Sequence, residues 1–147
     1  MTKITFVLIV LQLAFFVGYS EVILGAPIAQ PTTITPDLKA LLNAGLEQVH
    51  NLGGSYEIQN PTEVIVMQYS TQVVSGTLSK LLVEVRSDSG SKLVSADIWD
   101  EPWTGRVHQL KKACSYANNV GNFYPTQCGS VEDCVALLMK NGNCRDI

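Results

Sequence analysis

Basic residues are sparse in this sequence, and no two of its ten lysines and arginines adjoin except Lys111 and Lys112. A protein that binds nucleic acid needs a basic stripe to replace the counterions of the phosphates. The formal net charge is −3 at pH 7. Composition therefore excludes that class of protein, and we expect no nucleic-acid partner.

Motifs for metal, redox and catalytic chemistry are also missing. The four cysteines form no Cys-x-x-Cys pair, so neither a zinc site nor a thioredoxin-like site is indicated. His50 and His108 have no nucleophile or acid beside them in the sequence that would suggest catalysis. No paired carboxylates or phosphate-binding loop occur. We expect no enzymatic activity, no cofactor and no bound metal.

Long apolar runs are confined to the first twenty residues. Lys3 supplies a positive start, and the apolar run from Ile4 to Val17 precedes Gly18-Tyr19-Ser20, which offers small residues to a signal peptidase. The run is too short for a comfortable membrane span, although an uncleaved anchor is the alternative. We predict a signal peptide over residues 1–20, a secreted extracellular chain and no membrane partner. A second possible cut, after Ala26, would remove a candidate site.

All four cysteines lie in the last quarter of the chain. Export places them in an oxidising compartment, where an even number of thiols is expected to pair. The sequence therefore predicts two disulfides, with all three pairings open. The residues are Cys114, Cys128, Cys134 and Cys144.

One amphipathic helix follows an extended arm. Residues 21–36 are rich in proline and threonine and show no period. Thr35 can cap a helix and Pro36 suits its first position, because the missing N–H would be unpaired there. Apolar residues at helical spacing then continue to Val49, and Gly53-Gly54 ends the pattern. Gly45 lies on the apolar stripe, where it would allow close approach to a sheet.

Residues 55–113 have the composition and alternation of β-strands. Gly76, Asp88-Ser89-Gly90 and residues 101–105 separate four such strands, and an edge strand is possible near Tyr56. The predicted fold class is α+β, with an antiparallel sheet of four or five strands wrapped around one long helix. Trp99, inside a strand, is expected to be structural.

The C-terminal residues 115–147 differ from the rest. Ser130 can cap a short helix that runs to about Lys140, where Asn141-Gly142 stops it. We expect this short disulfide-stapled segment to have little core of its own and to depend on its disulfides.

Three short motifs resemble the inhibitory segments of secreted cystatins. The run Gln72-Val73-Val74-Ser75-Gly76 matches the family's Gln-x-Val-x-Gly signature and lies between two predicted strands. Pro102-Trp103 matches its Pro-Trp dipeptide. Upstream, Ile23-Leu24-Gly25-Ala26-Pro27 resembles its apolar-apolar-Gly segment. The resemblance divides the mature chain into a cystatin domain, residues 21–114, and a cysteine-containing extension, residues 115–147.

The resemblance implies a cystatin-like fold and a reversible, competitive, tight-binding inhibitor of papain-like, cathepsin-type cysteine proteases. An N-terminal segment and two hairpin loops would fill the active-site cleft of the protease, and we expect a monomer. The implied protease-binding residues are Val22, Ile23, Leu24, Gly25, Gln72, Val73, Val74, Ser75, Gly76, Pro102 and Trp103.

Several alternatives stay open beside this resemblance. Cys114 stands where the family has its last cysteine, but the usual partner position, near Val94, holds no thiol, so Cys114 pairs within the tail or stays free. Trp103 could be a core aromatic rather than an interface anchor. The alternative function is a secreted cystatin-fold binding protein without inhibitory activity, in which residues 115–147 are the functional module.

Overall fold

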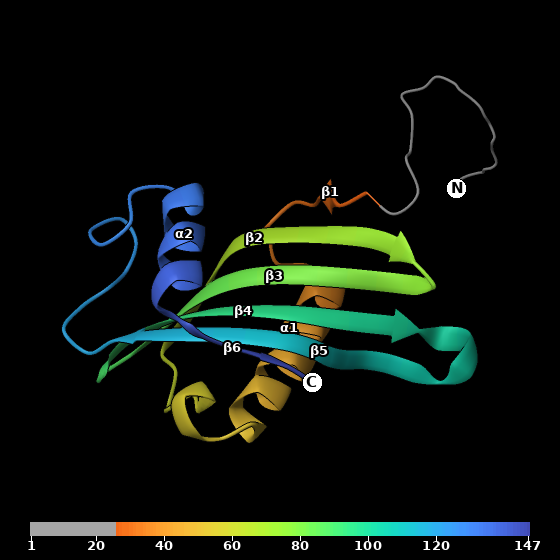
Figure 1. Cartoon of the computed structure of the whole chain (residues 1–147), viewed down its shortest axis with the longest axis horizontal. Helices are drawn as coiled ribbons and strands as arrows, with labels where there is room; N and C mark the ends of the chain where they lie inside the picture. The colour runs from red at the N-terminus through yellow and green to blue at the C-terminus, as the bar shows by residue number, and fades with distance from the viewer. Residues whose placement is uncertain (1–25) are drawn as a thin grey trace.

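A single antiparallel sheet organises the chain in the computed structural model, which describes residues 26–147 (Figure 1). The predicted signal peptide and the candidate contacts Val22, Ile23, Leu24 and Gly25 lie outside the described residues. The strands, which lie in chain order across the sheet, are β1 (Ile28–Ala29), β2 (Glu63–Val74), β3 (Gly76–Ser87), β4 (Gly90–Glu101), β5 (Arg106–Asn118) and β6 (Asn143–Asp146).

The prediction of an α+β fold with an antiparallel sheet is confirmed, and the four central strands lie where sequence alternation indicated. The predicted number of strands is wrong, because the described residues form six rather than four or five. Tyr56 belongs to a short 3₁₀ turn, η1 (Gly54–Tyr56), and the edge strand is β1, inside the expected arm. Two or four residues paired at a sheet edge leave no periodic pattern in a sequence.

The first helix, α1 (Pro36–Asn51), begins as predicted and spans 16 residues, so the expected long helix is a short one. The Thr35 hydroxyl accepts a hydrogen bond from the Leu38 N–H at 3.2 Å, and Pro36 fills the first position. A Cβ on Gly45 would collide with the Ile98 side chain of β4, so glycine permits the helix to approach the sheet here. No helix within residues 26–147 is both long and apolar enough to cross a membrane.

The two faces of the sheet bury different segments of the chain. Every second residue of β3 and β4 points to the same face of the sheet, and those on one face, such as Val83 and Val94, pack with Leu41 and Val49 of α1. The residues between them point to the other face and form a second apolar cluster with the C-terminal extension. Its buried members are Leu82, Leu93, Cys114, Phe123, Cys128, Cys134 and Leu138. The sheet is therefore covered on both faces, by α1 on one and by the extension on the other (Figure 1).

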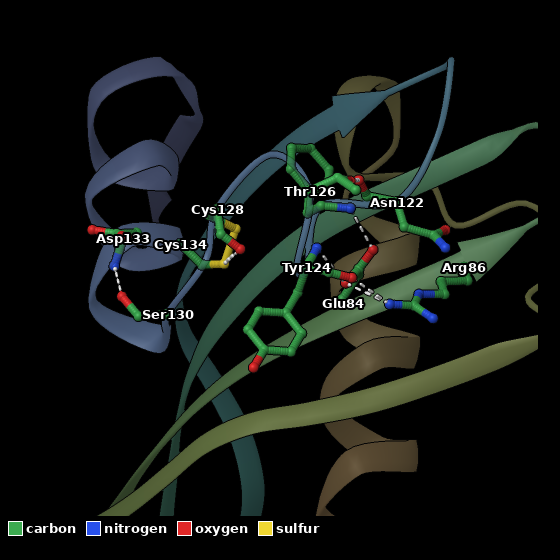
Figure 2. Close-up of a disulfide and its surroundings, with 10 residues drawn as sticks. Glu84, Arg86, Asn122, Tyr124, Thr126, Cys128, Ser130, Asp133 and Cys134 are labelled. Atoms are coloured by element: carbon green, nitrogen blue, oxygen red, sulfur yellow. Dashed lines mark hydrogen bonds and ion pairs between the residues drawn. A yellow bond between two sulfur atoms is a disulfide. The ribbon is translucent and has the colours of Figure 1, made fainter.

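The extension folds back onto the sheet and ends as a strand. Its helix α2 (Val131–Asn141) begins where Ser130 accepts the Asp133 N–H at 3.1 Å. Strand β6 then pairs with β5. The prediction of two disulfides is confirmed, and the structure selects one pairing: Cys114 with Cys144, and Cys128 with Cys134. Figure 2 shows the Cys128–Cys134 bond. The first bond joins β5 to β6, and the second joins the loop before α2 to the first turns of that helix.

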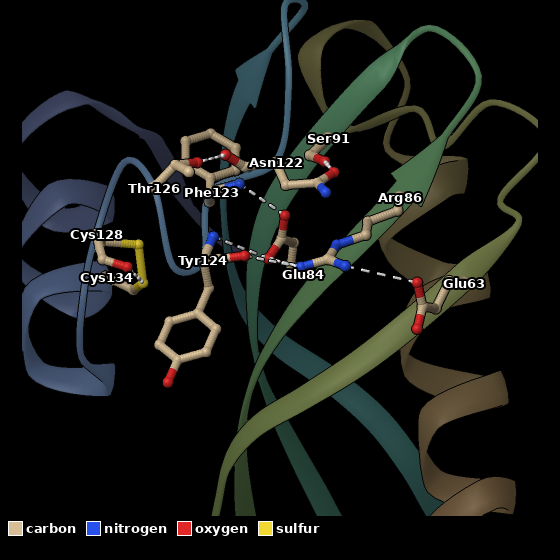
Figure 3. Close-up of polar contacts among 10 residues, drawn as sticks. All are labelled: Glu63, Glu84, Arg86, Ser91, Asn122, Phe123, Tyr124, Thr126, Cys128 and Cys134. Carbon is tan, nitrogen blue, oxygen red and sulfur yellow. Dashed lines mark hydrogen bonds and ion pairs between the residues drawn. A yellow bond between two sulfur atoms is a disulfide. The ribbon is translucent and has the colours of Figure 1, made fainter.

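The extension is also held by a buried carboxylate, a contact that the sequence did not indicate. Glu84 of β3 is fully buried on the face that the extension covers. Its carboxylate accepts the backbone N–H groups of Phe123 at 2.7 Å and Tyr124 at 3.2 Å (Figure 3). Arg86 lies 3.3 Å from the same carboxylate and donates to the Tyr124 carbonyl at 2.8 Å. Glu84 therefore pins residues 123–124 to the sheet.

Burial of Glu84 by itself raises its pKa. The hydrogen bonds from Arg86 and from the two N–H groups lower the pKa by a larger amount, so the net change is a decrease. Hydrogen bonds to an ionised carboxylate are stronger than neutral ones. A carboxyl group with a lowered pKa in the folded state stabilises the protein above its ordinary titration range, and this stabilisation is lost as pH falls through the folded-state pKa.

We predict that Glu84→Gln lowers the free energy of unfolding by about 2 kcal/mol at neutral pH, because the charge-assisted bonds are lost. The difference between the variant and the parent protein should shrink as pH falls below 4.5, the ordinary pKa of this group. Urea unfolding across a pH series measures both effects.

The matched control is Glu63→Gln. Glu63 is the other carboxylate beside Arg86, at 3.6 Å, but its side chain is 59% exposed. An exposed ion pair contributes little, so this variant should change stability by less than about 0.5 kcal/mol. Equal effects of the two substitutions would contradict the role assigned to Glu84.

Candidate functional site

The two predicted binding hairpins lie at the same end of the sheet. Strand β2 ends at Val74 and β3 returns from Gly76, while β4 ends at Glu101 and β5 returns from Arg106. Since β3 pairs with β4 along its length, the two turns are neighbours (Figure 1). The structure thus brings together Gln72 to Gly76 and Pro102-Trp103, two motifs about thirty residues apart in the chain.

Both hairpin tips expose apolar side chains. Val73 is 46% exposed, Val74 43% and Trp103 71%. Pro102 and Trp103 belong to a single 3₁₀ turn, η2 (Pro102–Thr104), which Gly105 closes in the left-handed conformation. A side chain as large as Trp103 at this exposure is not part of the core, so the alternative of a core aromatic is excluded. The tips therefore form an exposed apolar edge, which consists of Val73, Val74, Pro102 and Trp103.

Glu101 clamps the two hairpins together. It is only 7% exposed, and its Oε2 accepts the Ser75 hydroxyl of the first hairpin at 2.9 Å. Its Oε1 accepts the Thr104 hydroxyl of the second hairpin at 2.9 Å and lies 3.5 Å from the Arg106 guanidinium. One carboxylate thus joins both turns. Sequence analysis missed Glu101, whose only signal was its position directly before Pro102-Trp103.

Trp99 adds a second link between the hairpins. Its indole Nε1–H donates to the Ser75 carbonyl at 2.7 Å. Arg106 and Lys111 lie over its ring, at 5.9 Å and 5.1 Å from the centroid. Cations at such distances are attracted to the face of an indole. The expectation that Trp99 is structural is confirmed, and its contact is with the first hairpin tip.

The second hairpin is also braced from α1. The β4–β5 register shifts between Trp99 and Glu101, opposite a segment where His108 has a φ of 52°. The side-chain amide of Gln48 spans this irregular backbone, donating to the His108 carbonyl at 2.5 Å and accepting the Leu110 N–H at 3.0 Å. The helix therefore holds the stem of the β4–β5 hairpin.

The N-terminal arm leads toward the same end of the sheet. In strand β1, Ile28 pairs with Thr71 and Ala29 with Ser70, antiparallel to β2. Moving backward along the arm from Ile28 therefore means moving forward along β2, toward Val74. The Gln30 side chain donates to the Thr71 hydroxyl at 3.0 Å and helps to hold the arm in this register.

No group of three or more histidine, cysteine or acidic side chains within the described part of the chain is arranged to hold a metal ion. No family model matches the chain, and a search of the curated proteins finds no relative. The arrangement at this end is an exposed apolar edge whose two turns are held by hydrogen bonds from Glu101, Trp99 and Gln48.

The close approach of the two hairpins requires glycine at position 76. Gly76 has a φ of +98°, and a Cβ there would overlap the backbone carbonyl of Asp100. Gly105 has a φ of +79° with no atom near its Cβ position, and Gly121 has neither constraint.

We predict a graded series of alanine substitutions, measured by urea unfolding. Gly76→Ala should destabilise the fold by more than about 2 kcal/mol, because backbone strain and steric overlap add. Gly105→Ala, with strain alone, should cost about 1 kcal/mol, and Gly121→Ala should stay within about 0.5 kcal/mol. Equal effects at positions 76 and 105 would show that the hairpins do not depend on this contact.

Proposed function

We propose that this protein is a secreted, monomeric inhibitor of papain-like cysteine proteases, with a cystatin-like domain that carries its inhibitory edge on two hairpins and the N-terminal segment. The observation that carries this proposal is the exposed apolar edge, with Trp103 at its most prominent point. The motifs Gln72 to Gly76 and Pro102-Trp103 supply the resemblance, and their adjacency in space supports it.

The fold is compatible with this proposal. A cystatin-like domain consists of an antiparallel sheet over a helix, and β2 to β5 over α1 have this arrangement. The short β1 and the added β6 extend the sheet at its two edges without occupying the hairpin end. The disulfides Cys114–Cys144 and Cys128–Cys134 are typical of proteins that mature outside the cytosol.

The physical basis of inhibition would be preorganisation. A papain-like protease has a cleft with a Cys–His pair at its floor. The edge of Val73, Val74 and Trp103 would fill that cleft, and no peptide bond of the inhibitor would reach the thiolate in an attackable position. Because Glu101, Trp99 and Gln48 already hold the hairpins, little conformational freedom is lost on binding, which favours high affinity.

The N-terminal segment would complete the edge. Val22, Ile23 and Leu24 would occupy the non-primed substrate pockets, and Gly25 would let the chain turn away from the catalytic sulfur. Support for this part is the direction of β1, which leads the arm toward the hairpin end.

The alternative is a binding protein without inhibitory activity, in which the extension is the functional module. One experiment separates the two functions. The mature protein is titrated against papain and a panel of cathepsins, with steady-state kinetics and intact-mass measurement of the complex. We predict reversible, competitive inhibition without a covalent adduct. No inhibition of any member at micromolar concentration would reject the proposal and favour the alternative.

Variants then locate the contact. We predict that Trp103→Ala and Val74→Asp each weaken inhibition by about 2 kcal/mol or more, on the scale of an interface hot spot and about thirtyfold in the inhibition constant. Both residues are exposed, so circular dichroism should remain native. Val120→Asp is the matched control, since Val120 is 90% exposed but lies in the extension. Equal inhibition constants for all three variants would rule out the hairpin edge as the contact.

A further inference from the structure

The extension creates a cavity that the sheet alone would not have. The space has a volume of about 260 Å³ and lies between α2 and the face of the sheet opposite α1. Its apolar wall combines Leu82 of β3 with three residues of α2, which are Val135, Leu138 and Met139. Leu82 and Leu138 are buried, while Met139 is 51% exposed at the rim. The cavity is thus apolar at its base and open to solvent at one side.

Beside Leu82, the sheet side of the cavity is charged. Lys80, Asp97 and Lys112 are cross-strand neighbours on β3, β4 and β5, and all three line the cavity. Among residues 26–147, none of the three makes a direct ion pair or a side-chain hydrogen bond. The next lysine along, Lys111, differs because its ammonium lies over the Trp99 ring. Three charged groups without direct partners therefore face one small cavity.

The charged wall favours an anion over a cation. It presents two ammonium groups and one carboxylate. Partial burial raises the pKa of Asp97, the neighbouring Lys80 and Lys112 lower it, and Asp146 raises it, with a net increase. The two lysines outnumber the single carboxylate among the charged residues that line the cavity. Asp146 lies on β6 beyond Lys112 and does not line the cavity.

We propose that this cavity binds a small amphiphile with one negative charge, a carboxylate that carries an aliphatic chain of medium length. The chain lies against Leu82, Val135 and Leu138, and the carboxylate faces Lys80 and Lys112. The volume is just below the range of about 300–1,000 Å³ that is usual for small-molecule sites, which limits the chain to a medium length. The site is distinct from the hairpin edge, and its occupancy does not depend on protease inhibition.

The test is calorimetric titration of the full mature protein with decanoate, below its micelle concentration and at about pH 7. Decyltrimethylammonium carries the same chain with the opposite charge, and butanoate carries the same head group with a short chain. We expect saturable binding of one decanoate, and binding of both other compounds weaker by about tenfold or more. Absence of saturable decanoate binding would overturn the proposal. So would equal affinity for the two ten-carbon compounds, which would indicate a non-selective apolar surface.

Four variants assign the charged wall. Lys80→Gln and Lys112→Gln should each weaken decanoate binding by about fivefold, the effect of one partly screened charge. Asp97→Asn should strengthen binding by a similar factor, because it removes the like charge. Lys111→Gln is the matched control and should leave binding unchanged. Weaker binding in Asp97→Asn, or tighter binding of decyltrimethylammonium than of decanoate, would show that Asp97 receives a cationic head group and would overturn the assignment.

Discussion

The continuous antiparallel register of β2, β3, β4 and β5 is the constraint on which the rest of the molecule depends. Antiparallel strands of about equal length place alternate turns at opposite ends of a sheet, so the β2–β3 and β4–β5 hairpins share one end. Side chains alternate between the two faces. The same register therefore decides which residues face α1, which face the extension, and which lie in the cross-strand row of Lys80, Asp97 and Lys112.

At the hairpin end, hydrogen bonds hold the backbone in place, a role that apolar packing has elsewhere in the molecule. Two adjacent tips that expose valine and tryptophan side chains have little core beneath them. Glu101 and Trp99 replace that core with directed hydrogen bonds to Ser75, and Gln48 adds a link from the helix. The absence of a side chain at Gly76 lets the two backbones meet. The apolar edge can be both exposed and well ordered because directed hydrogen bonds support it.

The extension changes what the sheet can do. A sheet with one apolar and one polar face needs only one covering layer. Here Leu82, Leu93 and Glu84 on the second face are buried by residues after β5. The disulfides restrict the positions that the extension can occupy on the sheet. The Glu84 carboxylate fixes the position of residues 123–124 by accepting their backbone N–H groups. The cavity under α2 is a consequence, because a helix laid over a sheet at one end leaves space toward the other. The proposed inhibitory edge and the proposed amphiphile site thus lie on separate parts of one sheet.

The sequence alone determined the features that depend on neighbours along the chain. The start of α1 at Thr35-Pro36, the start of α2 at Ser130 and the turn at Asp88-Ser89-Gly90 follow from caps and turn residues that act over a few positions. The alternation of apolar residues was likewise sufficient to locate four strands. The two cystatin-like motifs could be assigned to hairpins for the same reason, since each lies between strands that the pattern identified.

Only the tertiary structure decided the features that join distant segments. The pairing Cys114–Cys144 and Cys128–Cys134 depends on where β6 and the loop before α2 come to rest. Strands β1 and β6 are too short to carry a periodic pattern and exist because the edges of β2 and β5 offer them partners. The roles of Glu84 and Glu101 were invisible for a further reason. A single glutamate reads as a solvated charge in any sequence, and only burial against particular N–H and hydroxyl donors makes it an anchor.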